Sequence, residues 1–164
     1  MLALARDALP TPDTIDVGPI IAEISQRWAP RFDESQRELV ATIESDLPGA
    51  SVRRGSIEQA VEVLLENALR HGAGETRLTA RSARGGLVVQ VDDDGPGIDT
   101  NEVVTVFERH EGAGTGIGLT LARTLVEADG GRLLLTDPER AEFRIILAGI
   151  GPSMIGEGPV TSPR

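Results

Sequence analysis

Apolar residues recur at intervals of three and four positions in three stretches of the chain. Such spacing places the apolar side chains on one face of a helix. The stretches predict helices over residues 18–28, 56–70 and 119–128. Pro30 is expected to close the first helix. Ser56 and Gln59 fit a capping box that would start the second, and His71 with Gly72 would end it.

Alternating or β-branched stretches predict strands between these helices. The predicted strands are residues 38–45, 50–54, 75–81, 87–92, 132–136 and 142–147. Residues 82–86 read as the turn of a hairpin. Because three apolar helix faces have only one sheet to cover them, the pattern predicts an α/β (α+β) two-layer sandwich, with a mixed sheet of about five strands and three helices on one face.

The length of 164 residues suits a single domain. We expect residues 1–13 to be the end of an upstream helix and a linker, because Pro10 and Pro12 break the pattern there. Residues 14–148 would form the domain. Glycine, proline and serine dominate residues 149–164, which predicts a disordered tail.

Composition removes several classes of function. All 16 basic residues are arginine, so a Walker A lysine, the strand lysine of Ser/Thr/Tyr kinases and a Schiff-base lysine are excluded. The absence of cysteine excludes disulfides and thiolate metal sites. The net charge of −10 argues against nucleic acid as a partner, since phosphate binding needs a basic field.

A glycine-rich run, Gly-Ala-Gly-Thr-Gly-Ile-Gly-Leu at 112–119, opens the third predicted helix. Glycines let main-chain N–H groups approach a phosphate, and a helix N-terminus adds partial positive charge. The same run fits a plain flexible loop. A dinucleotide-binding fold would need a strand directly before it, and irregular chain precedes it instead.

An acidic turn, Val-Asp-Asp-Asp-Gly-Pro-Gly-Ile at 91–98, follows a predicted strand. It fits a solvated turn, and it lacks the ligand spacing of an EF-hand calcium loop. A buried aspartate beside close-packed glycines could instead accept a hydrogen bond from the exocyclic amine of adenine.

The second predicted helix ends in Glu-Asn-Ala-Leu-Arg-His at 66–71. An asparagine in an apolar helix is unfavourable unless its amide is satisfied, so Asn67 is either exposed or functional. Its oxygen could bind Mg²⁺, with Arg70 available to a phosphate. Arg70 and His71 could also simply complement the helix dipole.

The order of these motifs resembles the ATP-binding domain, of Bergerat-type fold, shared by sensor histidine kinases, DNA gyrase, a heat-shock chaperone family and mismatch-repair ATPases. It is most similar to the histidine kinase catalytic domain, over about residues 16–147. Residues 64–71 resemble its N box, 93–98 its first glycine box, 106–109 its F box and 114–119 its second glycine box.

The resemblance implies an ATP site with Mg²⁺. Asn67 would ligate Mg²⁺, Asp93 would bind the adenine amine, and main-chain amides of 114–119 would hold the phosphates. Phe107 would pack under a mobile lid spanning about 100–113. The implied nucleotide-binding residues are Asn67, Arg70, His71, Asp93, Gly95, Gly97, Ile98, Phe107, Gly114, Thr115, Gly116, Ile117, Gly118 and Leu119.

Some positions depart from the family pattern. Val63 stands where hydrolytic relatives have a glutamate base and many histidine kinases an asparagine, so efficient water activation is not expected. Glu66 is the one candidate catalytic carboxylate nearby, but a helix turns it about 100° from Asn67, which favours a solvated face. Asp129 replaces a histidine, His110 a phenylalanine and Ala141 a threonine.

Neither His71 nor His110 has the sequence context of the family's phosphoacceptor histidine. We therefore expect the chain to bind ATP and donate its γ-phosphoryl group to a histidine on a dimerisation domain outside the chain. Residues 1–13 would be the end of that domain's helix and a linker.

The resemblance further implies an indirect partnership with a response regulator, a homodimer formed only by the full-length parent, and a cytoplasmic domain of a parent that is often membrane-anchored. An anti-sigma-type serine kinase and a non-catalytic nucleotide-binding interaction module remain as alternatives.

Overall fold

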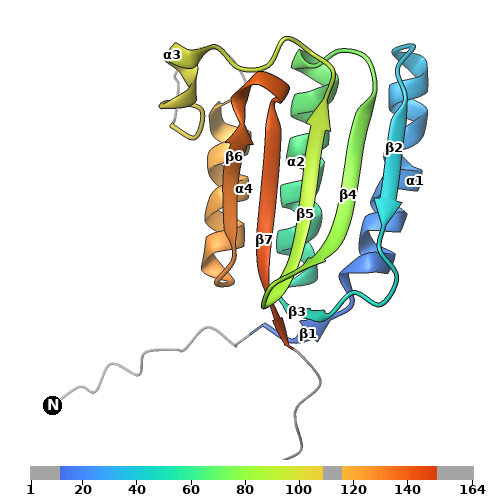
Figure 1. Cartoon of the computed structure of the whole chain (residues 1–164), viewed down its shortest axis with the longest axis vertical. Coiled ribbons are helices and arrows are strands. Elements are labelled where there is room, and N and C mark those ends of the chain that lie inside the picture. The colour runs from blue at the N-terminus through green and yellow to red at the C-terminus, as the bar shows by residue number, and fades with distance from the viewer. Residues whose placement is uncertain (1–11, 109–115, 151–164) are drawn as a thin grey trace, which may run out of the picture.

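The computed structural model describes residues 12–108 and 116–150. These residues form two layers, with three long helices behind one sheet in Figure 1. The helices are α1 (Val17–Glu34), α2 (Arg54–His71), α3 (Thr100–Val103) and α4 (Gly116–Ala128). The predicted two-layer sandwich is confirmed. The predictions for His110, Gly114, Thr115, most of residues 1–13 and most of 149–164 lie outside the described residues.

The sheet is mixed, as predicted. Its strands are β1 (Thr14–Ile15), β2 (Leu39–Ile43), β3 (Gly49–Ser51), β4 (Thr76–Ala83), β5 (Gly86–Asp93), β6 (Arg132–Asp137) and β7 (Glu142–Ile150). They follow the order β1-β3-β7-β5-β4-β2, and β6 also pairs with β7. β2 and β4 run parallel, whereas the other pairs run antiparallel. Among the described residues the sheet has seven strands instead of about five, partly because the two residues of β1 are too few to show any alternation.

Pro30 does not close α1, contrary to the prediction, because the helix continues to Glu34. A proline inside a helix removes one main-chain hydrogen bond. Trp28 and Phe32, on either side of it, are both buried in the core, and their burial favours continuing the helix. Asp16 caps the start of α1 by accepting a hydrogen bond from the Gly18 N–H at 3.1 Å.

The predicted capping box at Ser56 is also wrong, because α2 begins two residues earlier, at Arg54. Its N-cap residue, Arg53, makes no side-chain cap hydrogen bond. Instead, Arg53 donates its main-chain N–H to the Asp129 carboxylate at 3.0 Å. Asp129 belongs to the turn after α4, so a distant side chain replaces the local box.

The core fills the space between the sheet and the three helices. Its largest fully buried side chains are Phe32, Phe143, Ile21, Ile24, Ile57, Leu64, Leu65, Leu78, Leu87, Leu133, Ile145 and Leu147. Among the residues described, no helix combines the length and the apolar character that a membrane span requires. With this core in place, the ends of α2 and β5 are fixed relative to each other.

Candidate functional site

The residues singled out by the sequence on α2, β5 and the loop after β5 gather at one end of the sheet. In Figure 1 the C-terminal end of α2 and the end of β5 lie together at the top, beside the segment that leads to α3. A Cβ atom on Gly72, which follows α2, would collide with the carboxylate of Asp93, the last residue of β5. The last turn of α2 and the Asp93 side chain are therefore immediate neighbours.

The three consecutive aspartates at 92–94 have different environments. Arg77 on β4 binds both outer ones, with Nε 2.7 Å from Asp92 Oδ2 and Nη1 2.9 Å from Asp94 Oδ1. The hydrogen bond from Arg77 also holds the pKa of the Asp94 carboxyl below its usual value. Because side chains alternate along a strand, Asp93 points to the opposite face, toward the helices. Only the middle aspartate is thus left without an arginine partner among the described residues.

Asp93 is buried, with 3% of its surface exposed. Its Oδ1 accepts hydrogen bonds from the Gly95 N–H at 2.6 Å and the Ala73 N–H at 3.2 Å. A Cβ atom on Gly95 would lie 2.5 Å from that oxygen, so the position requires glycine. Oδ2 accepts no hydrogen bond from any residue that the structure describes. A buried carboxylate with one oxygen uncommitted can accept a hydrogen bond from a ligand donor.

Gly97 holds the loop after β5 against the connection between β6 and β7. Its φ is +76°, and an added Cβ would lie 2.5 Å from the carbonyl oxygens of Pro138 and Glu139. The Ile98 N–H donates to the Pro138 carbonyl at 2.8 Å. Residues 95–98 are therefore fixed by backbone packing, and position 97 requires glycine because a side chain would collide with the two carbonyl groups.

Asn67 lies on α2 one turn before its end and is half-buried. No hydrogen bond to its amide comes from the described part of the chain. In the same part, no group of three or more His, Cys, Asp or Glu residues could hold a metal ion. Any metal at this site would therefore take its other ligands from a bound molecule and water, as Mg²⁺ commonly does.

Glu66 lies on an exposed face of α2. Its side chain is 60% exposed and forms an ion pair of 3.3 Å with Arg70, one turn along α2. Such an exposed pair contributes little to stability. His71, the last residue of α2, is also exposed. This geometry supports the solvated face expected for Glu66, and it leaves Arg70 and His71 on an accessible surface.

Phe107 is anchored to α4 and to the core. Its ring meets Phe143 edge-on, with centroids 6.0 Å apart, and the Arg123 guanidinium lies 4.9 Å from its centroid. The Thr120 hydroxyl donates to the Phe107 carbonyl at 2.6 Å. The described end of the predicted lid is therefore tied to α4.

The start of α4 packs closely against α2. A Cβ atom on Gly118 would lie 3.3 Å from Val63 Cγ1, so glycine permits the two helices to approach. Val63 is one turn before Asn67 on α2, so the start of α4 packs against the turn of α2 that precedes Asn67. Ile117 is exposed, whereas the Leu119 side chain is buried in the core and could contribute only its main chain to a site.

Arg77 was missed by the sequence reasoning. The hairpin register places it directly opposite Asp92. Opposite charges at facing positions stabilise a strand pair. The predicted hairpin over 75–81 and 87–92 therefore contained the signal, once its register was worked out.

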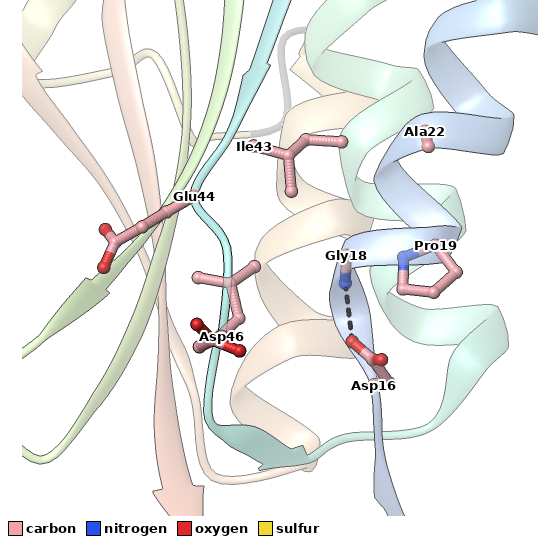
Figure 2. Close-up of a pocket in the computed structure, with 8 residues that line it drawn as sticks. Asp16, Gly18, Pro19, Ala22, Ile43, Glu44 and Asp46 are labelled. Carbon is pink, nitrogen blue, oxygen red and sulfur yellow. Dashed lines mark hydrogen bonds between the residues drawn. The ribbon is translucent and has the colours of Figure 1, made fainter.

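A cavity of about 530 Å³ lies at the other end of the fold, between the start of α1 and the end of β2 (Figure 2). It is lined by Asp16, Gly18, Pro19, Ala22, Ile43, Glu44, Asp46 and Leu47. The lining contains three carboxylates and no basic side chain, which is unfavourable for an anionic ligand. None of the residues predicted to bind nucleotide lines this cavity.

Comparisons with known proteins agree with the order of the motifs. Residues 53–149 match the family model described as "Histidine kinase-, DNA gyrase B-, and HSP90-like ATPase". The chain is similar to the alginate biosynthesis sensor protein KinB of Pseudomonas aeruginosa, with 31% identity over 142 residues that cover 80% of this chain and 24% of KinB. It is also similar to the sensor histidine kinase component HK1 of Mycobacterium tuberculosis, with 30% identity over 138 residues that cover 79% of this chain and 82% of HK1.

Among solved structures, the chain resembles the crystal structure of full-length ShkA in complex with AMPPNP, with a TM-score of 0.74 and 25% identity over 85% of this chain and 32% of ShkA. The chain spans 24%, 20% and 28% of the lengths of the curated relatives KinB, CarS and GtrS, so it corresponds to one part of such proteins. The predicted family is confirmed: the chain belongs to the histidine kinase-, DNA gyrase B- and HSP90-like ATPase family, as a histidine kinase ATPase domain.

Proposed function

We propose that this chain binds ATP with Mg²⁺ and donates the γ-phosphoryl group to a histidine on a phosphoacceptor domain outside the chain. The family implies ATP binding. The observation that carries the proposal is the uncommitted Oδ2 of the buried Asp93, which can accept a hydrogen bond from the adenine amine. A relative of the same fold, ShkA, was solved in complex with AMPPNP.

The adenine would lie between the end of β5 and the loop 95–98. Asp93 accepts from its exocyclic amine, and Gly97 and Ile98 form the backbone wall fixed by the Pro138 carbonyl. Main-chain amides of residues 114–119 would hold the phosphates, aided by the N-terminal end of α4. Arg70 and His71 at the end of α2 are accessible for the phosphates and ribose.

Mg²⁺ fits the proposed site through one protein ligand. The half-buried Asn67 amide has an oxygen that no described residue engages, and it lies at the end of α2 that faces the site. Mg²⁺ takes hard oxygen ligands and keeps several waters and phosphate oxygens in nucleotide sites. When bound, the ion would neutralise the charge that develops as the phosphoryl group leaves ADP.

Val63 favours transfer over hydrolysis. Its side chain contacts the start of α4 and offers no carboxylate to activate water. In the proposed reaction an imidazole nitrogen of the external histidine attacks the γ-phosphorus, and the bond to the bridging oxygen of ADP breaks. The chain contributes position and charge stabilisation, while the other domain contributes the nucleophile.

The proposed partners follow because the chain would supply ATP and another domain the nucleophile. The direct partner is a dimerisation domain that carries the acceptor histidine, and a response regulator would take the phosphoryl group from it. The homodimer would belong to the full-length parent, and the domain would lie on the cytoplasmic side of a membrane-anchored parent. Sensor proteins such as KinB are longer than this chain, which supports the presence of further domains in the parent.

The proposal is tested by incubating the chain with γ-labelled ATP, Mg²⁺ and a histidine-bearing helix domain of a related sensor kinase. Acid-labile, base-stable label on that domain is expected. Label on an added serine-bearing protein would indicate the anti-sigma-type kinase instead. Nucleotide binding without any transfer would leave the non-catalytic module.

A further inference from the structure

Arg37 reaches from the segment after α1 to both sides of the connection between α2 and β4. Its Nη1 donates to the Ala68 carbonyl at 2.7 Å, its Nε to the Gly74 carbonyl at 2.9 Å and its Nη2 to the Thr76 hydroxyl at 2.9 Å. These three acceptors lie before, within and after the connection. One guanidinium therefore bridges the whole segment 68–76.

The acceptors on α2 explain part of this arrangement. The last four carbonyl groups of a helix have no partner within it. Arg37 Nη1 donates to the Leu69 carbonyl at 3.3 Å, and it adds a second hydrogen bond to the Ala68 carbonyl, which also accepts from the Gly72 N–H at 2.8 Å. Its Cζ also lies 5.5 Å from the ring centroid of Phe32, which is fully buried. The half-buried Arg37 thus lies against a core residue while it binds carbonyl groups at the end of the helix that carries Asn67.

The bridged connection supplies one of the two donors to Asp93. Ala73 lies between the residues that Arg37 holds, and its N–H donates to Asp93 Oδ1 at 3.2 Å. The Ala73 carbonyl in turn accepts from the Asp94 N–H at 3.1 Å. A displacement of the connection would therefore change the orientation of the Asp93 carboxylate directly.

We propose that Arg37 is a positioning residue for the adenine-binding carboxylate: through residues 72–74 it fixes the Ala73 N–H, which orients Asp93 so that Oδ2 faces the ligand. The inference rests on the proposed function for the identity of that ligand. Arg37 lies outside the family motifs, yet in this proposal it orients the carboxylate that binds adenine. A lysine could not replace it, because a single ammonium group cannot reach the three acceptors in the geometry of the guanidinium fork.

The test uses the full 164-residue chain and three variants. Arg37→Gln removes the fork, Arg37→Lys keeps the charge, and Arg53→Gln is the matched control. Arg53 is an arginine bound at the opposite end of the same helix, to Asp129. Each protein is examined for thermal unfolding, for ADP affinity by calorimetry and for amide hydrogen exchange at Ala73 relative to Gly95.

We expect Arg37→Gln to lower ADP affinity about tenfold, the scale at which loss of a group that orients a binding residue is felt. Exchange at Ala73 should accelerate relative to Gly95. Arg37→Lys should show the same changes even where Arg37→Gln does not fold. Arg53→Gln should lower the unfolding temperature and leave both the affinity and the exchange ratio unchanged.

Two results separate the possible failures. If the Arg37 variants unfold at a lower temperature but retain the ADP affinity and the Ala73 exchange ratio, Arg37 has a purely structural role and the inference is overturned. If the wild-type chain does not bind ADP while Ala73 exchange still depends on Arg37, the positioning of Asp93 stands and the proposed function fails.

Discussion

The Asp129 carboxylate accepts two hydrogen bonds from Arg53, one from the main-chain N–H at 3.0 Å and one from Nε at 2.7 Å. Only 1% of the Asp129 side chain is exposed. The turn after α4 thereby completes the first turn of α2. We expect Asp129→Asn to lower the free energy of unfolding by about 1.5–3 kcal/mol, because charge-assisted hydrogen bonds are lost in a buried site. Urea denaturation measures the change, and the exposed Asp46→Asn serves as the control with the same change in charge.

The same carboxylate predicts a pH dependence of stability. Burial opposes ionisation of Asp129, but hydrogen bonds from Arg53 and from the Ser56 hydroxyl outweigh it, so the pKa is lowered. A lowered pKa means that the unfolded chain binds the proton more tightly, and the contribution to stability is lost as the pH falls. The difference in unfolding free energy between wild type and Asp129→Asn should be constant from pH 8 to about pH 5 and shrink below about pH 4. A difference that grows in acid would contradict this.

Local patterns in the sequence were sufficient for the three long helices and most strands, because each of them buries apolar side chains, whereas the short α3 has no buried residue and was not predicted. The two wrong predictions concern the end of α1 and the start of α2, where contacts with residues outside the local pattern set the boundary of the helix. Pro30 is held inside α1 by the burial of Trp28 and Phe32 around it. The start of α2 is set by Asp129, which is 76 positions from Arg53 in sequence. The capping-box pattern spans only four consecutive residues, so it contains no information about a partner as distant in sequence as Asp129.

In the candidate site, too, some residues belong to sequence motifs and others depend on distant contacts. The motif order predicted Asp93, Gly95 and Gly97, and the two glycines lie where an added Cβ would collide with neighbouring atoms. The arginines that hold the site in place, Arg37 and Arg77, carry no motif. Their partners are set by strand register and by the path of the chain around α2. Register could have revealed Arg77, whereas the contacts of Arg37 with main-chain carbonyls have no sequence signal.

Gly97 and Gly85 form a matched pair for testing the loop after β5. Both have positive φ, +76° and +81°, but an added Cβ meets two carbonyl oxygens at 2.5 Å in Gly97 and nothing within 4 Å in Gly85. Gly85→Ala should lower the free energy of unfolding by about 1–2 kcal/mol from backbone strain alone. Gly97→Ala should cost about 1–3 kcal/mol more and weaken ADP binding, because the loop must move away from 138–139. Equal effects of the two variants would show that this close contact is not maintained.

Asp93→Asn should weaken ADP binding far more than it lowers stability. An amide can turn a donor toward the adenine amine, and a lost charge-assisted bond of about 1.5–3 kcal/mol corresponds to roughly 10- to 150-fold in affinity. Calorimetry measures the affinity, and Asp46→Asn again provides the control, because it removes one negative charge far from the site. Equal ADP affinity in wild type and Asp93→Asn would remove Asp93 from the site.

Glu66→Gln tests whether a carboxylate on α2 takes part in the chemistry. The Glu66 side chain is exposed and paired with Arg70, so its loss should leave phosphoryl transfer to a helix domain largely unchanged. The rate of label transfer at saturating ATP measures this. A large fall in that rate, with unchanged nucleotide affinity, would make Glu66 a catalytic residue.

The last prediction concerns Asn67 and the direction of the reaction. Alone, the chain should neither label itself nor release phosphate appreciably, because Val63 supplies no base for water and neither histidine has an acceptor context. With a helix domain supplied, label should move to that domain, and Asn67→Ala should abolish the transfer because Mg²⁺ would lose its protein ligand. The same variant should bind Mg²⁺-free ADP with nearly the wild-type affinity, which separates loss of the metal from loss of the fold.

Acid-labile label on the isolated chain that disappears in His71→Ala or His110→Ala would place the acceptor within it. Rapid phosphate release without a partner would instead assign the chain to the hydrolytic branch of its family.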